Sequence, residues 1–139
     1  MAILFKNNFI EVRYEPNEHI VVGSWQDTDK ETFTDSVFRE CMLQWFEEVK
    51  KIGNVNVLAD ARKFLFTIGL NTQTWINENI IGLYPLHGVT KLGFLVSADL
   101  IAQISIEQTI EEKQQKFQVR YFSDLAEATQ WLSKSIPQQ

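Results

Sequence analysis

The spacing of apolar side chains changes along this sequence and separates expected strands from expected helices. Residues Phe9 to Tyr14 alternate between apolar and polar, and a second apolar segment, Ile20 to Trp25, follows Pro16 and Asn17. Alternation with a period of two is typical of strands, and Pro and Asn favour tight turns. The pattern predicts an N-terminal hairpin.

Apolar residues then recur at every fourth position from Phe33 to Val49, with further apolar residues beside them. This spacing predicts a long helix over residues 29–52 with a wide apolar face. We expect side-chain oxygens from Asp27 to Asp29 to cap its N-terminus, and we expect Gly53 to end it.

The rest of the chain is organised around the short apolar segment from Val55 to Arg62. Its nearly continuous apolar character predicts a strand that is buried on both faces. It ends in an acid, Asp60, and a base, Arg62, which share a face if the strand continues and can then pair. Loops at the carboxyl ends of strands collect sites in open α/β sheets, so both residues are candidate contacts for a partner or an anion. A purely structural ion pair is the alternative.

The connection after this strand, from Lys63 to Leu70, is unusually apolar. Two interpretations of Phe64, Phe66 and their neighbours stay open. In the first, they line a groove above the sheet that binds a lipid or a small apolar ligand. In the second, they cover the sheet edge by ordinary packing. The sequence does not decide between a binding role and a packing role for this connection.

A second helix is expected after this connection. Asn71 or Thr72 can cap it, Trp75 lies in its first turn, and it should stop before Pro85. Trp75 is the tryptophan that most resembles a contact residue, because it lies beside the apolar connection, whereas helical or strand packing explains the others.

Four more elements follow in the C-terminal part. We expect a strand over 91–97, a helix from Leu100 to about Gln114, a strand over 117–122, and a last helix that opens at residues 124–127 with an acidic variant of the capping box. After the hairpin, every strand is thus followed by a helix. This order predicts one α/β domain with about four helices and a mixed, mostly parallel sheet that begins with an antiparallel hairpin.

Composition narrows the classes of function. Of the 139 residues, 13 Lys and Arg against 18 Asp and Glu give a net charge of −5, which disfavours nucleic acid as a partner. Cys41 is the single cysteine, and His19 and His87 lack neighbours at metal-ligand spacing, so we expect no disulfide, metal or other cofactor. No segment has the pattern of a leader or a transmembrane segment, so we expect a cytoplasmic protein.

The ordered set of segments resembles the SpoIIAA-like proteins, whose fold is that of STAS domains (sulfate transporter and anti-sigma factor antagonist). The resemblance depends on the hairpin, the long helix, the Asp-Ala-Arg end of the central strand, and the strand from Leu92 to Val96. It depends above all on Val119 to Leu132, where an aromatic strand and an acidic turn lead into a helix that reads Ala, two further residues, then Trp-Leu. It covers nearly the whole chain and implies a small cytoplasmic interaction and regulatory module rather than a catalyst.

In bacterial anti-sigma factor antagonists of this fold, a serine at the start of the helix after the central strand is phosphorylated, and its charge releases the partner. The serine pair and the glycine of that motif are missing here, so this regulation is not carried over. The corresponding region contains Thr67, Gly69, Asn71, Thr72 and Thr74. Thr67 and Thr72 stay candidate phosphate acceptors, with helix capping as the alternative for Thr72. The fold also resembles lipid-binding Sec14-type domains, which would give the apolar connection a purpose.

The leading hypothesis is a non-enzymatic module that binds an unidentified protein partner through the edge from Asp60 to Trp75. Its candidate binding residues are Asp60, Arg62, Phe64, Phe66, Thr67, Thr72 and Trp75. The alternative is a lipid or small apolar ligand under the connection from Phe64 to Leu70. A third hypothesis is an enzyme whose catalytic residues converge from distant positions. An exposed sheet edge and an apolar loop also make a homodimer plausible.

Overall fold

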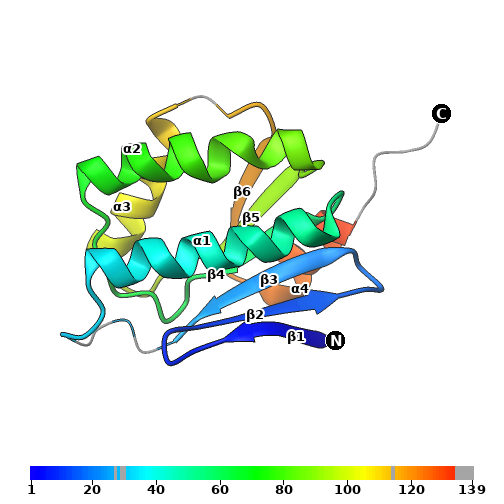
Figure 1. Cartoon of the computed structure of the whole chain (residues 1–139), viewed down its shortest axis with the longest axis horizontal. Coiled ribbons are helices and arrows are strands. Elements are labelled where there is room, and N and C mark those ends of the chain that lie inside the picture. The colour runs from blue at the N-terminus through cyan, green and yellow to red at the C-terminus, as the bar shows by residue number, and fades with distance from the viewer. Residues whose placement is uncertain (27, 29–30, 114, 134–139) are drawn as a thin grey trace.

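The computed structural model of the protein describes residues 1–26, 28, 31–113 and 115–133. Its centre is one six-stranded sheet whose strands lie side by side in chain order (Figure 1). The strands are β1 (Ala2–Lys6), β2 (Ile10–Glu15), β3 (Ile20–Trp25), β4 (Asn56–Asp60), β5 (Lys91–Leu95) and β6 (Gln118–Phe122). Pairing is antiparallel from β1 to β3 and parallel from β3 to β6, which confirms the expected mixed α/β sheet.

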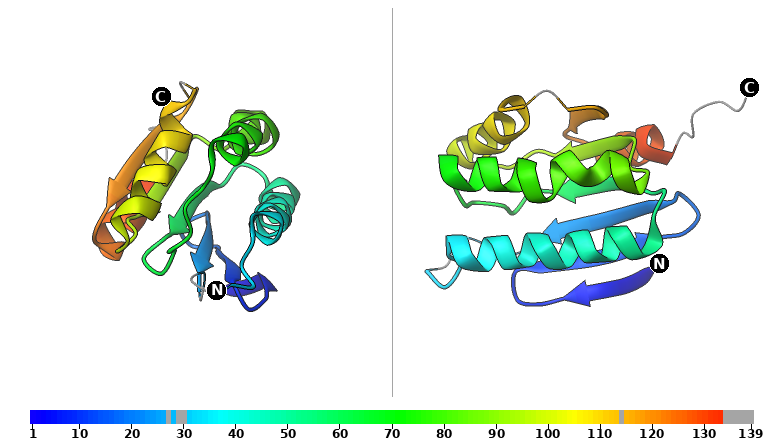
Figure 2. Two further views of the ribbon diagram at one scale, coloured as in Figure 1. Left: turned by 90° about the vertical axis from the view of Figure 1, so that its left-hand side faces the viewer. Right: turned by 45° about the horizontal axis from the view of Figure 1, so that its top comes forward.

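Helices cover the sheet on both faces. They are α1 (Asp35–Ile52), α2 (Leu70–Asn79), the 3₁₀ segment η1 (Ile81–His87), α3 (Leu100–Glu111) and α4 (Leu125–Ser133). Helices α1, α2 and α3 lie on one face, and α4 lies on the other (Figure 2). Among the described residues, no helix combines the length and the apolar character needed to cross a membrane.

The side chains of β4 alternate between two apolar cores. Val57 and Ala59 join the large core under α1, α2 and α3, whereas Leu58 joins a smaller core with Val22 of β3 and Leu132 of α4. The three β4 side chains are at most 4% exposed. The prediction of a central strand buried on both faces is therefore confirmed.

The start of α1 differs from the expectation of a helix over 29–52. The helix begins at Asp35, because Thr34 has an extended backbone and its Oγ1 accepts a hydrogen bond from the N–H of Val37 at 3.2 Å. The caps expected at Asp27 and Asp29 lie outside the described residues. The sequence contains several oxygen-bearing side chains before this helix, so spacing alone did not select Thr34.

Gly53 ends α1 as predicted, with a positive φ of 69° that glycine adopts without strain. The start of α2 was predicted incorrectly. This helix begins at Leu70 after Gly69, which makes no side-chain capping bond, so Asn71 and Thr72 lie inside the helix. The hydroxyl of Thr72 has other partners, described below.

The remaining boundaries are close to those expected. The α-helical part of α2 ends before Pro85, but the chain stays helical in η1, which includes that proline because its ring is compatible with 3₁₀ geometry. Helix α3 ends at Glu111, and the expected end near Gln114 lies outside the described residues. The carboxylate of Asp124 accepts a hydrogen bond from the N–H of Glu127 at 3.2 Å, as the capping pattern predicts.

The sequence pattern does not predict β1. This strand pairs with β2 at the edge of the sheet, and its register shifts between Ile3 and Phe5. Ile3 is 54% exposed although it is apolar. An edge strand with exposed residues lacks the clear alternation that marks a half-buried strand, so the pattern gave no signal.

Candidate functional site

The connection between β4 and α2, residues 61–69, is held in place by side chains from elsewhere in the fold. The side chains from distant segments that bond to its backbone include those of Thr28, Gln73, Ser97 and Ser105. They bind the carbonyls of Lys63, Phe64 and Ile68 and the N–H groups of Leu65 and Ile68, over 2.5 to 3.2 Å. Because backbone groups that leave water need such partners, this connection is a fixed platform rather than a loose loop.

The side chains of this connection lie on two sides of it. Phe64 is 1% exposed and Ile68 is 5% exposed, and both are part of the large core. Phe66 packs partly against the same core, with its ring centroid 5.1 Å from that of Phe33. Leu65 and Thr67 are exposed. Packing therefore accounts for Phe64 and largely for Phe66, while Leu65 and Thr67 face outward.

Large apolar side chains are exposed around the carboxyl ends of the parallel strands. They come from the connection, the first turn of α2 and the first turns of α3, and we call them the apolar rim: Leu65, Leu70, Leu100, Ile101 and Ile104. The N-termini of α2 and α3 lie at the same end of the sheet (Figure 1). The two most exposed, Leu70 and Leu100, have 74% and 72% of their surface accessible.

The first two turns of α3 carry apolar residues on the outer side as well as on the inner side, whereas Gln108 and Glu111 are exposed further along. Ala102 and Ile106 face the core, whereas Leu100, Ile101 and Ile104 face outward. A surface helix normally carries polar residues on the side that faces water, and a helix that is apolar all round is normally covered all round. The outer side of these first two turns therefore has the composition of a surface that another molecule covers.

Asp60 and Arg62 form the ion pair that their spacing predicts. Two guanidinium nitrogens of Arg62 donate to the two carboxylate oxygens of Asp60, at 2.9 and 2.8 Å. Burial acts to raise the pKa of Asp60, but the hydrogen bonds and the charge of Arg62 outweigh it, so the pKa lies below its ordinary value. The pairing is confirmed, and a binding role for the two residues stays a prediction.

This pair opens onto the other face of the sheet from the one that α1 covers. In the strand register, Asp60 lies beside Ser24, which lies beside Glu11. A polar cleft of about 490 Å³ is found there, and its lining includes Glu11, Arg13, Ser24, Gln26, Asp60, Arg62 and Lys63. Ion pairs and hydrogen bonds to neighbouring side chains already occupy Arg13 and Arg62 in this cleft.

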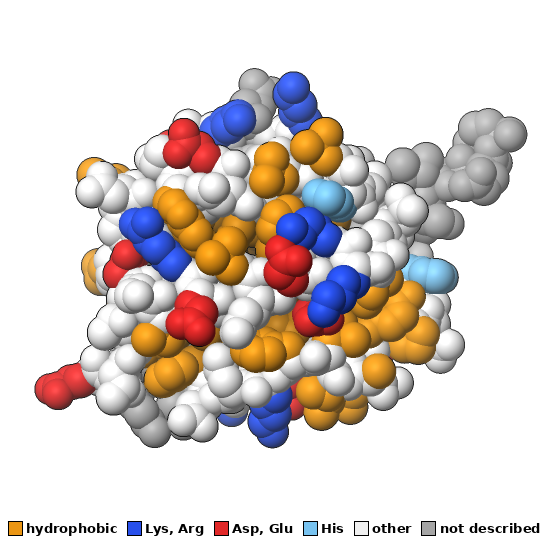
Figure 3. All heavy atoms as spheres, viewed as in Figure 1, with side chains coloured by type: hydrophobic (Ala, Val, Ile, Leu, Met, Phe, Trp, Pro, Cys, Tyr) orange, Lys and Arg blue, Asp and Glu red, His pale blue; other side chains and the backbone are white. Residues whose placement is uncertain are grey.

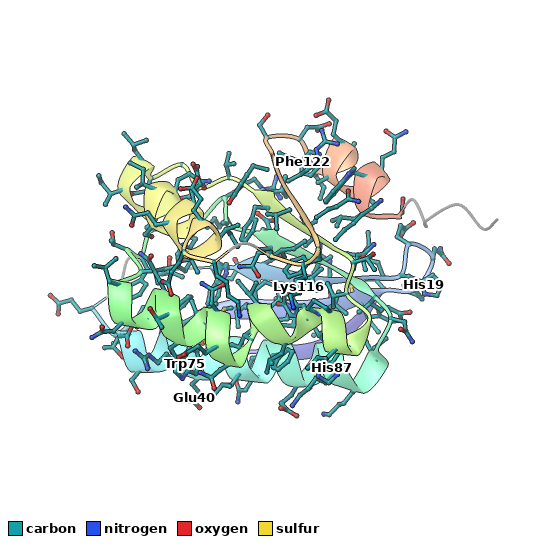
Figure 4. All side chains as sticks on the ribbon, turned by 90° about the horizontal axis from the view of Figure 1, so that it is seen from above. His19, Glu40, Trp75, His87, Lys116 and Phe122 are labelled. Carbon is teal, nitrogen blue, oxygen red and sulfur yellow. The ribbon has the colours of Figure 1, made fainter. Side chains whose placement is uncertain are left out.

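Thr72 and Trp75 join α2 to α1. The hydroxyl of Thr72 is buried, donates to a carboxylate oxygen of Asp35 and accepts from a guanidinium nitrogen of Arg39 at 2.8 Å. The Arg39 guanidinium also lies 5.1 Å from the centre of the ring of Trp75, which Figure 4 labels on α2. Thr72 therefore does not present its hydroxyl to a kinase, whereas Thr67 is exposed.

The predicted site thus divides into three places. Asp60 and Arg62 lie on one face of the sheet, Phe64 and Phe66 lie against the core, and Thr72 and Trp75 lie between α1 and α2 on the other face. The surface over α1 and α2 shows apolar patches interspersed with acidic and basic side chains (Figure 3). The expectation of one continuous edge from Asp60 to Trp75 is therefore wrong for these side chains.

Sequence reasoning missed the part of the rim that α3 supplies. The signal was present in Leu100, Ile101 and Ile104, since three apolar residues over two turns cannot all face the core with Ala102 and Ile106. It also missed the side chains that hold the connection in place, because a serine or a glutamine in a helix carries no sign of a distant backbone partner. Only the tertiary fold identifies those contacts.

No cluster of three or more His, Cys, Asp and Glu side chains suited to a metal is found in the part of the chain that the structure describes. Cys41 is buried on the inner side of α1, and burial raises the pKa of its thiol, so it behaves as a small apolar residue. Comparison of the chain with protein-family models, curated proteins and solved structures found no match.

Proposed function

We propose that this protein is a non-enzymatic interaction module of the STAS type, and that it binds a protein partner through the apolar rim. The resemblance in sequence suggests the type of module, and the α/β sheet with four helices agrees with it. The partner is a protein with a complementary apolar patch, because the rim offers apolar side chains from several segments rather than a pocket for one small molecule.

The observation that carries this proposal is the exposed apolar rim on a backbone that is held in place. Fully burying one Leu or Ile side chain contributes about 1.5–3 kcal/mol, so a few such residues suffice for a specific contact. The hydrogen bonds from Ser105 and Gln73 fix the connection before a partner arrives. Less conformational entropy is then lost on binding.

The charged groups near the rim support a binding role rather than catalysis. A general base that works near neutral pH needs a pKa close to the working pH. For a carboxyl group this requires a raised pKa, whereas the pKa of Asp60 is lowered, and its carboxylate is paired with Arg62. Asp35 is likewise paired with Arg39, at 2.9 Å. These groups are arranged to hold structure.

Affinity capture from an extract of the organism that encodes the protein tests the proposal. We expect the double variant Leu100→Glu, Ile101→Glu to lose a partner that the wild type retains. With the purified pair, calorimetry should show affinity reduced by at least about tenfold, since a charge in an apolar contact costs more than 1.4 kcal/mol. Both positions are exposed, so the fold should survive the change.

Leu86→Glu is the matched control. Leu86 is also a highly exposed leucine, at 78%, but it lies in η1, which packs beside the amino end of β4. The variant Leu86→Glu should retain the partner. The proposal is wrong if the rim variant retains every specific partner, or if the rim variant and the control lose the same ones.

A further inference from the structure

Beneath the connection of residues 61–69, the large core contains an apolar cavity of about 50 Å³ between the sheet and the helices of one face. Side chains that line it include Trp25, Trp45, Phe64, Ile68, Tyr84 and Thr109. Protein cores pack nearly as densely as crystals of small organic molecules, with few voids of this size. The cavity lies in the core, whereas the rim lies on the surface, so an inference about the cavity does not depend on the proposed function.

One buried polar group in the wall of the cavity has no partner. The indole Nε1 of Trp45 makes no hydrogen bond to any described residue, although Trp45 is only 3% exposed. Native proteins rarely leave a buried N–H without an acceptor, and each such case needs an explanation such as a bound molecule. Here the residue with the unpartnered N–H, Trp45, also lines the cavity.

Trp45 cannot turn its indole elsewhere to find an acceptor. Its ring lies on the backbone of β3 at Gly23, where an added Cβ would come within 2.5 to 2.7 Å of three ring atoms. On another side, the ring of Trp25 meets it edge to face, with centroids 6.3 Å apart. The indole of Trp45 is therefore held in a fixed position in the core, and its N–H has no acceptor among the described residues.

Two hydroxyl groups lie in the same wall. The hydroxyl of Tyr84 is protonated at neutral pH, and burial raises its pKa further above the ordinary value. The hydroxyl of Thr109 donates to the carbonyl of Ser105 at 2.8 Å, which leaves its oxygen as an acceptor. The other lining residues are predominantly aliphatic and aromatic. The cavity thus offers an apolar wall with one unused N–H donor and few other polar groups.

We propose that this cavity binds a small, mainly apolar molecule with one hydrogen-bond acceptor, such as a short ketone, whose oxygen accepts from Trp45 Nε1. An apolar protein cavity of about 150 Å³ takes benzene, so one of about 50 Å³ takes only a few heavy atoms. An acyl chain of a lipid does not fit this space. Water is a poor occupant of so apolar a wall, because a buried water usually makes about three hydrogen bonds.

Nuclear magnetic resonance of the ¹⁵N-labelled full chain tests the proposal with acetone as the probe. The indole N–H signals of the four tryptophans lie in their own spectral region, and loss of one signal in Trp45→Phe assigns that of Trp45. We expect acetone to shift this signal downfield in a saturable manner, with smaller effects on the other three. Xenon, which fills space but accepts no hydrogen bond, should perturb the same region without the downfield shift.

Ala59→Val fills the cavity without touching the donor, since Ala59 lies in its wall on β4. This variant should keep the Trp45 signal and lose at least about nine tenths of the acetone-dependent shift. If it does not fold, slowed exchange of the Trp45 indole proton by acetone in the wild type supplies the second measurement. The proposal is overturned if acetone leaves the Trp45 signal unmoved, or moves all four signals alike. It is also overturned if a tightly held water occupies the site and acetone does not displace it.

Discussion

Asn56 joins three parts of the molecule through one side-chain amide. Its Oδ1 accepts hydrogen bonds from the N–H and hydroxyl of Thr90 and from the N–H of Lys91, over 3.0 to 3.2 Å. Its Nδ2 donates to the carbonyl of Leu132 at 2.8 Å, near the end of α4. The last carbonyls of a helix have no partner within it, so this donor helps to attach α4 to the sheet.

Replacing Asn56 should therefore destabilise the fold. We expect Asn56→Leu to lower the free energy of unfolding by about 2 kcal/mol, because the groups it binds lose their partners. Asn56→Asp keeps the acceptor for Thr90 and Lys91 but sets a carboxylate oxygen against the carbonyl of Leu132, so it should also be less stable than the wild type. Urea unfolding measures both. The interpretation is wrong if Asn56→Leu unfolds at the wild-type midpoint.

The ion pair of Asp60 predicts a dependence of stability on pH. The pKa of Asp60 in the folded protein lies below the ordinary value of 3.8, mainly because Arg62 binds its charged form. The ion pair therefore contributes its full stabilisation above the pKa that Asp60 has in the unfolded chain. This stabilisation is lost as the pH falls through the lower pKa that Asp60 has in the folded protein. The difference in unfolding free energy between wild type and Asp60→Asn should be constant above about pH 5 and shrink in more acidic solution. A difference that does not change between pH 5 and pH 2 would refute this.

The polar contacts between α2 and α3 set the conformation of the connection before α2. Gln73 and Asn77 are each 2% exposed, and Asn77 Nδ2 donates to the carbonyl of Thr109 at 2.7 Å. Ser105 Oγ accepts from the N–H of Ile68 at 3.0 Å. Gln73, Asn77 and Ser105 therefore occupy buried helical positions at which the spacing rule predicts apolar residues.

Ser105→Ala should loosen the connection without unfolding the protein. The N–H of Ile68 loses its acceptor, and we expect amide exchange over residues 61–69 to rise about fivefold, which corresponds to about 1 kcal/mol. Hydrogen exchange read by mass spectrometry measures this change. Ser133→Ala removes a serine hydroxyl bonded within α4 and should leave the connection unchanged. Equal effects of the two variants on residues 61–69 would contradict the role given to Ser105.

Elements with strong periodicity were predictable from the sequence, whereas the polar interface and the starts of α1 and α2 were not. The long apolar stripe of α1 and the short apolar segment of β4 can be recognised in the sequence. A buried face requires apolar side chains at a fixed spacing, whatever the element packs against. Thr72 shows the limit. Its position at the start of a helix suggests a cap, but its hydroxyl bonds to Asp35 and Arg39 of another helix.

The candidate site was predictable to the same extent. The spacing of Asp60 and Arg62 was sufficient to predict their ion pair, because both residues are close in the chain. The rim was not predictable as a unit, since Leu65, Leu70 and Leu100 come together only when the connection and two helices meet at one end of the sheet. Contacts between distant segments leave no local pattern.

For the molecule as a whole, exposed apolar surface and net charge act against each other. The apolar rim favours association of the protein with itself when no partner is present, whereas the net charge of −5 opposes it. A homodimer stays a prediction on this basis.

Association should therefore increase with salt. We expect light scattering at high protein concentration to show a larger average mass in 0.5 M than in 0.05 M salt, because salt screens the repulsion. The variant Leu100→Glu, Ile101→Glu should remain monomeric in both, and Leu86→Glu should behave as the wild type. Association of the rim variant to the wild-type extent would place the contact elsewhere.

The chain order of the strands has a consequence for biosynthesis. Each new strand pairs with the one made just before it, so the sheet can grow in step with the ribosome, without waiting for a strand encoded later to insert between two others. Only α4 breaks this sequence, because it covers Val22 and Leu58, which are made long before it. Until α4 emerges, that face is bare, and a nascent chain that stalls before residue 125 should be a preferred client of chaperones.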